Sequence, residues 1–152
     1  MHQFVAQVAT PMRDVQLWEN CAMTDADQLA RGILSELQRG FAAHDLAAVM
    51  RLLDDEVVVF GAAGQGLDAE HSRDYVSSML AQDGVVRWDW DRVVPVLAEP
   101  TVVVFAVVGT VGFDDAQGQA LGERSAFRLT CVAVLRDGRW RLRHFHGSVP
   151  QS

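Results

Sequence analysis

Apolar residues recur every four positions along residues 29–41, which is the spacing that places side chains on one face of an α-helix. Asp25 and Gln28 have the spacing of a capping box, a start signal for helices, so we expect this helix to begin near residue 24. The residues before it follow an irregular pattern that fits the rest of the chain badly. We therefore expect an N-terminal arm, residues 1–23, and one domain, residues 24–152.

Two shorter helices are predicted further along the chain. Asp45 and Asp68 are good helix N-caps, and each precedes a segment whose apolar residues fall on one side. Between these helices, residues 57–60 read Val-Val-Val-Phe, the β-branched and aromatic composition of a buried strand. The glycine-rich residues 61–66 match no phosphate-binding spacing, so we interpret them as a flexible rim.

After Gly84 the pattern changes from helical to strand-like. Asp137-Gly138 is a hairpin signal between two of the later segments. Because the helices precede most of the strands, the order predicts an α+β fold with a curved antiparallel sheet and helices on one face. The four segments after Gly84 are residues 85–97, 101–113, 124–135 and 140–146.

Charge and composition narrow the classes of partner. The formal net charge is −7 and the pI is about 5.0, so phosphate backbones and anionic membranes repel the chain, and we expect neither nucleic acid nor membrane partners. Cys21 and Cys131 lie far apart and match no metal-ligand spacing, which predicts two free thiols in a reducing cytosol. The first residues lack the basic and apolar regions of a signal peptide, and we expect a cytoplasmic protein.

Two segments carry a resemblance to a known family. Residues 41–60, FAAHDLAAVMRLLDDEVVVF, resemble the second helix and first strand of SnoaL-like domains in the nuclear-transport-factor-2-like superfamily. Residues 137–150, DGRWRLRHFHGSVP, are similar to the closing strands of that group and to the end of the association domain of calcium/calmodulin-dependent protein kinase II. The resemblance covers roughly residues 25–150 by element order. It implies a cystatin-like roll, that is, a cone-shaped curved antiparallel sheet with three N-terminal helices packed on its concave face. It also implies a small hydrophobic molecule in the cone and a homodimer through the outer sheet face.

The last strand holds the candidate catalytic residues. Trp140 and Leu142 prefer the core, whereas the arginines between them prefer water. Strict alternation would therefore turn His144 and His146 toward the concave face, where an imidazole could act as general acid, general base or anion ligand. The alternative is that both are structural histidines. A third metal ligand is not evident beside them, so we predict no metal.

Candidate ligand-binding residues come from several segments. Trp88 and Trp90 lie two residues apart and would form a flat wall for rings or acyl chains. Tyr75 would offer its hydroxyl from the third helix. Each of these residues could also be ordinary packing. The remaining candidates are Phe60, at the end of the first strand, and Phe127, Leu129 and Cys131, which alternate on one face of a later strand.

Other residues are assigned to the outside of the sheet. The alternation that turns Phe127 inward sends Val132 and Val134 outward, where they could pack in a dimer. Glu123 and Arg128 are interpreted as edge or interface charges rather than catalytic groups.

Two functions follow from these residues. The first is cofactor-independent acid–base cyclisation, isomerisation or dehydration of a small, polyketide-like substrate, with His144 and His146 moving protons. The alternative is a non-catalytic ligand-binding or oligomeric accessory protein. Relatives of this fold include ketosteroid isomerase, polyketide cyclases and epoxide hydrolases, so the fold alone selects no reaction. Steroid isomerisation is not expected, because the first strand offers no inward-facing acid.

Overall fold

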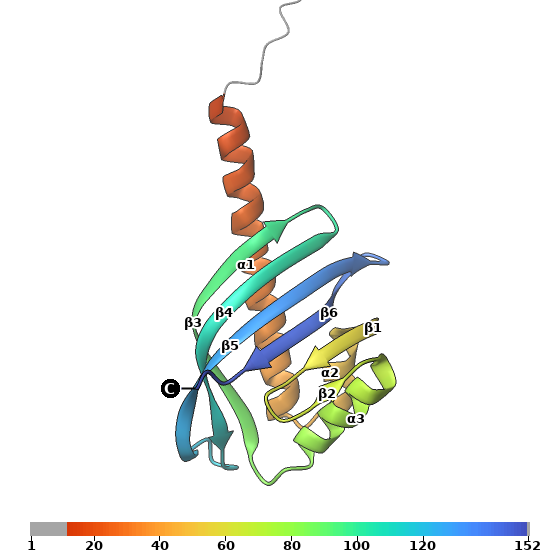
Figure 1. Cartoon of the computed structure of the whole chain (residues 1–152), viewed down its shortest axis with the longest axis vertical. Helices are drawn as coiled ribbons and strands as arrows, with labels where there is room; N and C mark the ends of the chain where they lie inside the picture. Colours follow the sequence, from red (N-terminus) through yellow and green to blue (C-terminus); the bar gives the residue numbers. More distant parts are fainter. Residues whose placement is uncertain (1–11, 152) are drawn as a thin grey trace, which may run out of the picture.

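Helices occupy one side of a six-stranded sheet in the computed structural model, which describes residues 12–151, with side chains from residue 22 onward (Figure 1). The helices are α1 (Met12–Ala42), α2 (Leu46–Arg51) and α3 (Ala69–Leu80). The strands are β1 (Leu53–Phe60), β2 (Gln65–Gly66), β3 (Val85–Ala98), β4 (Val102–Asp114), β5 (Ala120–Arg136) and β6 (Arg139–Ser148).

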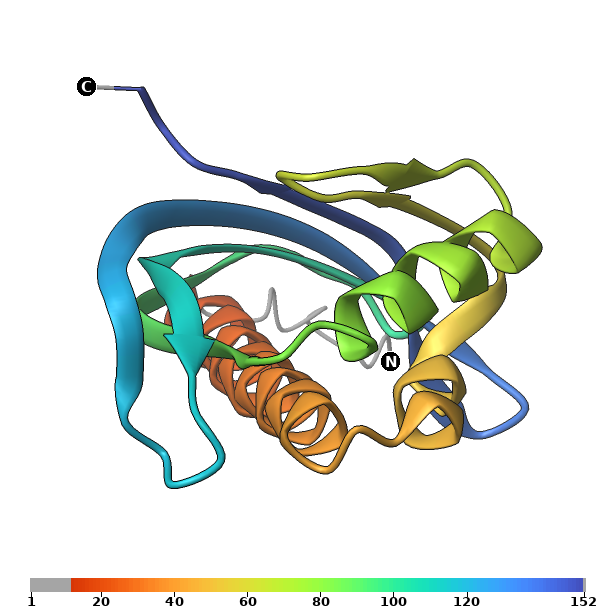
Figure 2. The same ribbon diagram turned by 90° about the horizontal axis from the view of Figure 1, so that it is seen from below.

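The sheet is curved, with α1 and α3 facing its inner side (Figure 2). Its strand order is β2-β1-β6-β5-β4-β3. The α+β class and the three helices are confirmed, but the expectation of an antiparallel sheet is wrong at one place, because β1 and β6 pair in parallel. Parallel pairing joins strands that are far apart in sequence, so no local turn signal announces it.

The first helix begins earlier than the capping-box spacing suggested. It starts at Met12 and runs across the predicted boundary at residue 24, so its N-terminal part extends beyond the sheet (Figure 1). Asp25 is exposed inside the helix and does not begin it. Residues 1–11 of the proposed arm lie outside the described part of the chain. The division into arm and domain stays a prediction.

Local signals for the two shorter helices are confirmed. The Asp45 carboxylate accepts a hydrogen bond from the Ala48 backbone N–H at 3.0 Å and caps α2. The Asp68 carboxylate accepts one from the His71 backbone N–H at 2.8 Å and caps α3. Both contacts satisfy N–H groups that a helix leaves unpaired at its first turn.

The α3 cap also links helix stability to pH. The Asp68–His71 hydrogen bonds lower the pKa of Asp68 below its ordinary 3.8 and raise the pKa of His71 above its ordinary 6.5. The stabilisation from Asp68 is complete above pH 3.8 and is lost as pH falls through the lowered pKa. The stabilisation from His71 is complete below pH 6.5 and is lost as pH rises through the raised pKa. This exposed pair therefore stabilises α3 most between those values.

The core lies between α1 and the concave face of the sheet. The four-residue periodicity of α1 is confirmed, with Ile33, Leu37 and Phe41 all buried. On β5 the predicted alternation is also confirmed, because Phe127 and Cys131 are buried. Gln38 fastens α1 to β3: its side-chain nitrogen donates to the Val86 carbonyl, and its side-chain oxygen accepts from the Trp88 backbone N–H, both at 2.8 Å. These two hydrogen bonds fix the position of β3, the strand that carries Trp88 and Trp90.

Candidate functional site: an apolar cavity

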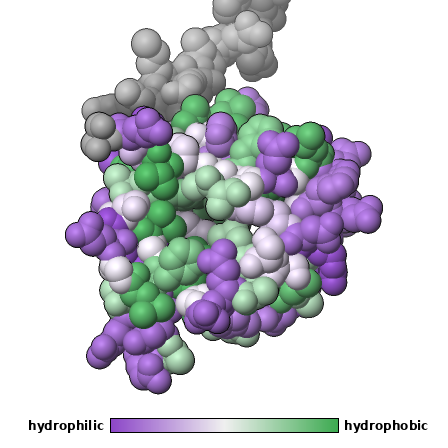
Figure 3. Space-filling model, turned by 60° about the horizontal axis from the view of Figure 1, so that its bottom comes forward, coloured by the Kyte–Doolittle hydropathy of each residue, from purple (hydrophilic) through white to green (hydrophobic). Residues whose placement is uncertain are grey.

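A cavity of about 310 Å³ opens between the concave face of the sheet and the helices. Figure 3 shows the hollow on the lower face of the molecule, with apolar side chains gathered around it. Ala62, Ala63, Glu123, Ser125 and Val149 are exposed and mark its mouth. Its buried lining is aliphatic and aromatic and consists of Leu37, Phe41, Val49, Leu53, Val59, Val76, Val86, Trp88, Phe127 and Phe145.

Aromatic rings form one wall of this cavity. Trp88 lines it and stacks on Trp90, with ring centroids 6.0 Å apart and planes 11° apart. Phe41 meets Trp88 edge-on at 5.0 Å, and Trp90 lies 6.2 Å from Phe127. The expectation that both tryptophans share a face is confirmed. Trp90 is not among the residues that line the cavity, but its ring stacks on Trp88 and supports the cavity wall from behind.

Tyr75 lines the cavity from α3 and is held by the glycine-rich segment after β1. A Cβ on Gly61 would overlap the Tyr75 hydroxyl, and one on Gly64 would lie 2.7 Å from the Tyr75 ring. The segment lies at the rim of the cavity as predicted, where it forms a close-fitting clasp closed by a 2.8 Å hydrogen bond from the Gly61 N–H to the Gly64 carbonyl. Burial raises the pKa of Tyr75, opposed by a backbone hydrogen bond from Ala63, so its hydroxyl stays protonated at neutral pH.

The two candidate catalytic histidines lie on the other face of the sheet. Their expected inward orientation is wrong, because a β-bulge interrupts the alternation of β6: Val132 pairs with His144, while its neighbour Ala133 pairs with Leu142. Arg143 is the extra residue of the bulge, so each side chain after it on β6 points to the opposite face from the one that strict alternation predicts. Phe145 consequently lines the cavity, and His146 is exposed.

Phe60 also lies on the outer face, where it packs between the two histidines. Its ring centroid is 5.5 Å from His144 and 5.4 Å from His146, both edge-on. The His144 Nδ1–H donates to the Val58 carbonyl at 2.8 Å, since a carbonyl can only accept. Phe60, a candidate ligand-binding residue, is therefore not part of the cavity lining, and its neighbour Val59 lines the wall instead.

Leu129 and Cys131 face the concave side as expected but are not among the residues that line the cavity. Both are packed into the core, with Cys131 fully buried and free. Burial raises the pKa of the Cys131 thiol, which makes it unreactive at neutral pH. The side chain of Cys21 lies outside the described part of the chain.

Glu123 and Ser125 were missed as cavity residues. The predicted strand began at Arg124, whereas β5 begins at Ala120, so Glu123 was assigned to an edge. Extending the alternation of Phe127 backward by two and four residues would have found both. Within residues 22–151, no group of three or more His, Cys, Asp or Glu residues could hold a metal ion. No helix in the described part of the chain is long and apolar enough to cross a membrane.

The curved sheet, the three helices on its inner side and the enclosed hollow define the cystatin-like class of nuclear-transport-factor-2-like folds. A family model of the SnoaL-like domain matches residues 31–152, and the chain belongs to that family. No curated protein sequence matches it.

Solved structures repeat the fold at low sequence identity. A protein of this superfamily from Pseudomonas putida, of unknown function, is 17% identical with a TM-score of 0.70, covering 85% of this chain and 89% of its own. A proposed calcium/calmodulin-dependent protein kinase II association domain from Xanthomonas campestris is 18% identical with a TM-score of 0.70, covering 81% and 86%. A proposed dehydratase from Streptomyces avermitilis is 11% identical with a TM-score of 0.70, covering 85% and 98%. Such likeness establishes the fold and leaves the reaction open.

Proposed function

We propose that this protein binds a small, ring-bearing apolar molecule inside the cone. The observation that carries the proposal is the cavity of about 310 Å³ whose buried lining consists of aliphatic and aromatic side chains. Ligand sites in proteins are concave, mainly apolar and begin at about 300 Å³, with a few polar groups that orient the ligand. Trp88 and Phe127 supply flat surfaces for a ring, and the Tyr75 hydroxyl supplies a hydrogen-bond donor.

Binding, rather than acid–base catalysis by histidine, is the function that this geometry supports best. His144 and His146 face away from the cavity, so they cannot reach a molecule held inside it. Among the described residues that line the cavity, the titratable side chains are Tyr75 and Glu123. The proposal therefore follows the non-catalytic alternative and assigns no proton transfer to the histidines.

The test is a fluorescence titration with N-phenyl-1-naphthylamine, a neutral probe that brightens in apolar surroundings. We expect saturable emission with one site per chain, because the cavity holds one ring system of this size. A linear increase without saturation would mean adsorption to scattered apolar surface and would reject the proposal.

We also propose that two copies pair through the outer face of the sheet. Neighbouring strands align Phe60, His146, Thr130, Ala106 and Val94 in one row across this face. In that row Val94 is 39% exposed. Exposed apolar side chains on this face, among them Val94 and Val108, favour association with a second copy.

Substituting Val94, which is exposed in this row, tests the pairing. In light scattering, the wild-type protein should have the mass of a dimer, and Val94→Glu, opposite Ala106, should weaken association at least tenfold, because it buries a charge at the interface. The control is Leu67→Glu, an exposed apolar residue before α3, which should leave the dimer intact. A monomeric wild-type protein would refute the pairing.

A further inference from the structure

Glu123 is the single charged residue among the described residues that line the cavity. It lies at the mouth, on β5, two residues from Ser125 and four from Phe127, all of which line the cavity. No ion pair within 4.0 Å neutralises Glu123 in the described part of the chain. An apolar cavity thus carries one free carboxylate where its interior meets solvent.

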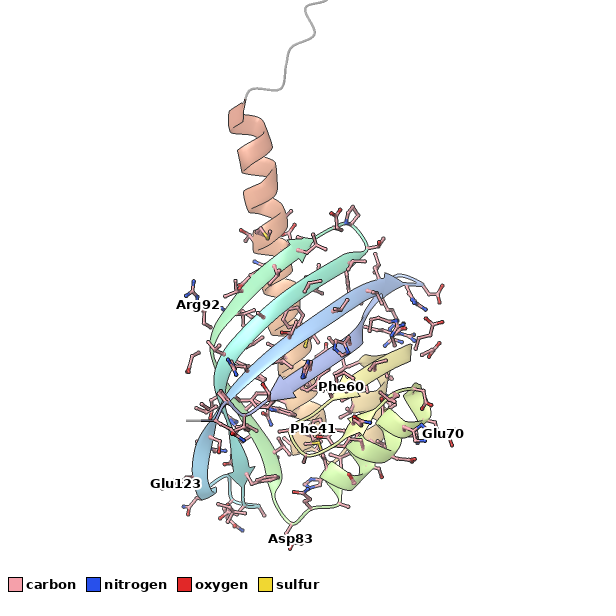
Figure 4. All side chains as sticks on the ribbon, in the orientation of Figure 1. Phe41, Phe60, Glu70, Asp83, Arg92 and Glu123 are labelled. Carbon is pink, nitrogen blue, oxygen red and sulfur yellow. The ribbon has the colours of Figure 1, made fainter. Side chains whose placement is uncertain are left out.

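The charges around this mouth are mostly negative. Arg124, the neighbouring cation, forms an ion pair with Asp114 and so offers no compensation to Glu123. Asp115 lies in the same β4–β5 turn, where it accepts hydrogen bonds from two backbone N–H groups. Glu123 and Asp83 lie at the same end of the molecule (Figure 4). A surplus of carboxylates at this end favours cations over anions.

We infer that the ligand is an amine: an apolar ring system with a cationic nitrogen that meets the Glu123 carboxylate at the mouth. This inference rests on the proposed function and adds the class of ligand. The ring would lie against Trp88 and Phe127, leaving the ammonium group in the partly hydrated mouth, where it keeps most of its solvation. A carboxylate on the same ring would face Glu123 and be repelled.

Three probes with one naphthalene skeleton separate charge from shape: 1-naphthylmethylamine, 1-naphthylmethanol and 1-naphthoate. In calorimetric titrations of the full chain at pH 7 and low salt, the amine should bind about threefold more tightly than the alcohol, the range of an exposed ion pair. The naphthoate should bind more weakly than the alcohol. Raising the salt concentration should shrink the preference for the amine, because solvent ions screen exposed charges.

The variant Glu123→Gln should remove the preference for the amine, so that the amine and the alcohol bind equally. Glu99→Gln is the matched control, because Glu99 is exposed in the β3–β4 turn and does not line the cavity. Equal binding of amine and alcohol by the wild-type protein, or a preference that survives Glu123→Gln, would overturn the inference while the proposed function stands. Failure of the neutral alcohol to bind at all would instead refute the proposed function, and the inference with it.

Discussion

Replacing Val76 with phenylalanine should weaken binding of a neutral aromatic probe at least tenfold and leave the free energy of unfolding within about 1 kcal/mol of wild type. Val76 is buried on α3 and lines the cavity. The phenylalanine ring is larger than the valine side chain, but it can extend into the empty cavity. It should therefore fill the cavity without straining the fold. Titration with N-phenyl-1-naphthylamine and urea denaturation measure the two effects.

A matched substitution distinguishes a cavity from a packed core. Val107 is equally buried, on β4, but does not line the cavity. Val107→Phe should destabilise the fold by about 1–3 kcal/mol, because a filled interior has no room for the added atoms. If Val76→Phe were as destabilising as Val107→Phe, or if it bound the probe normally, the site would not be where we place it.

Truncating Phe105 should have the largest effect on stability. Its side chain is fully buried on β4, between the partner positions Pro95 and Cys131, and lies away from the cavity. Phe105→Ala should lower the free energy of unfolding by about 3–5 kcal/mol, through lost burial and the void that remains. The midpoint and slope of a urea titration measure this loss.

The comparison for Phe105 is Phe113, which is partly buried and lies on the cavity wall. Phe113→Ala should cost clearly less than Phe105→Ala, because it enlarges an existing hollow and creates no new one in packed surroundings. If both substitutions lowered the free energy of unfolding equally, the surroundings of Phe113 would be as tightly packed as those of Phe105. The cavity would then be filled by side chains in solution.

Sequence reasoning succeeded where the determining contacts are local. Asp45 and Asp68 cap their helices through backbone groups three residues away, so their signals lie within one turn. Asp137 and Gly138 adopt φ values of 51° and 73°, the left-handed conformation that a two-residue hairpin requires. The inward set on β5, from Phe127 to Ala133, follows from the alternation of an uninterrupted strand.

The same alternation failed on β6 because the bulge there depends on distant partners. The Arg143 guanidinium donates to the Glu56 carbonyl and lies 4.0 Å from the buried carboxylate of Asp54, both on β1. Nothing near Arg143 in the sequence reveals those contacts, which accompany the parallel pairing of β1 with β6. A one-residue shift moved His144 and His146 to the outer face and brought Phe145 inward.

The site was partly accessible from sequence and partly not. Trp88, Tyr75 and Phe127 were identified from periodicity and all line the cavity. The clasp around Tyr75 was not identified, because it depends on Gly61 and Gly64 meeting a ring that is more than ten residues away along the chain. Contacts of this kind become visible only when α3 is placed beside β1.

A crystal structure of the protein soaked with 1-naphthylmethanol tests the central claim most directly. We predict that the naphthalene ring lies inside the cone, against Trp88 and Phe127, with the hydroxyl toward the mouth. A ring bound on the outer face beside Phe60 and His144, or an interior closed by its own side chains, would contradict this account of the protein.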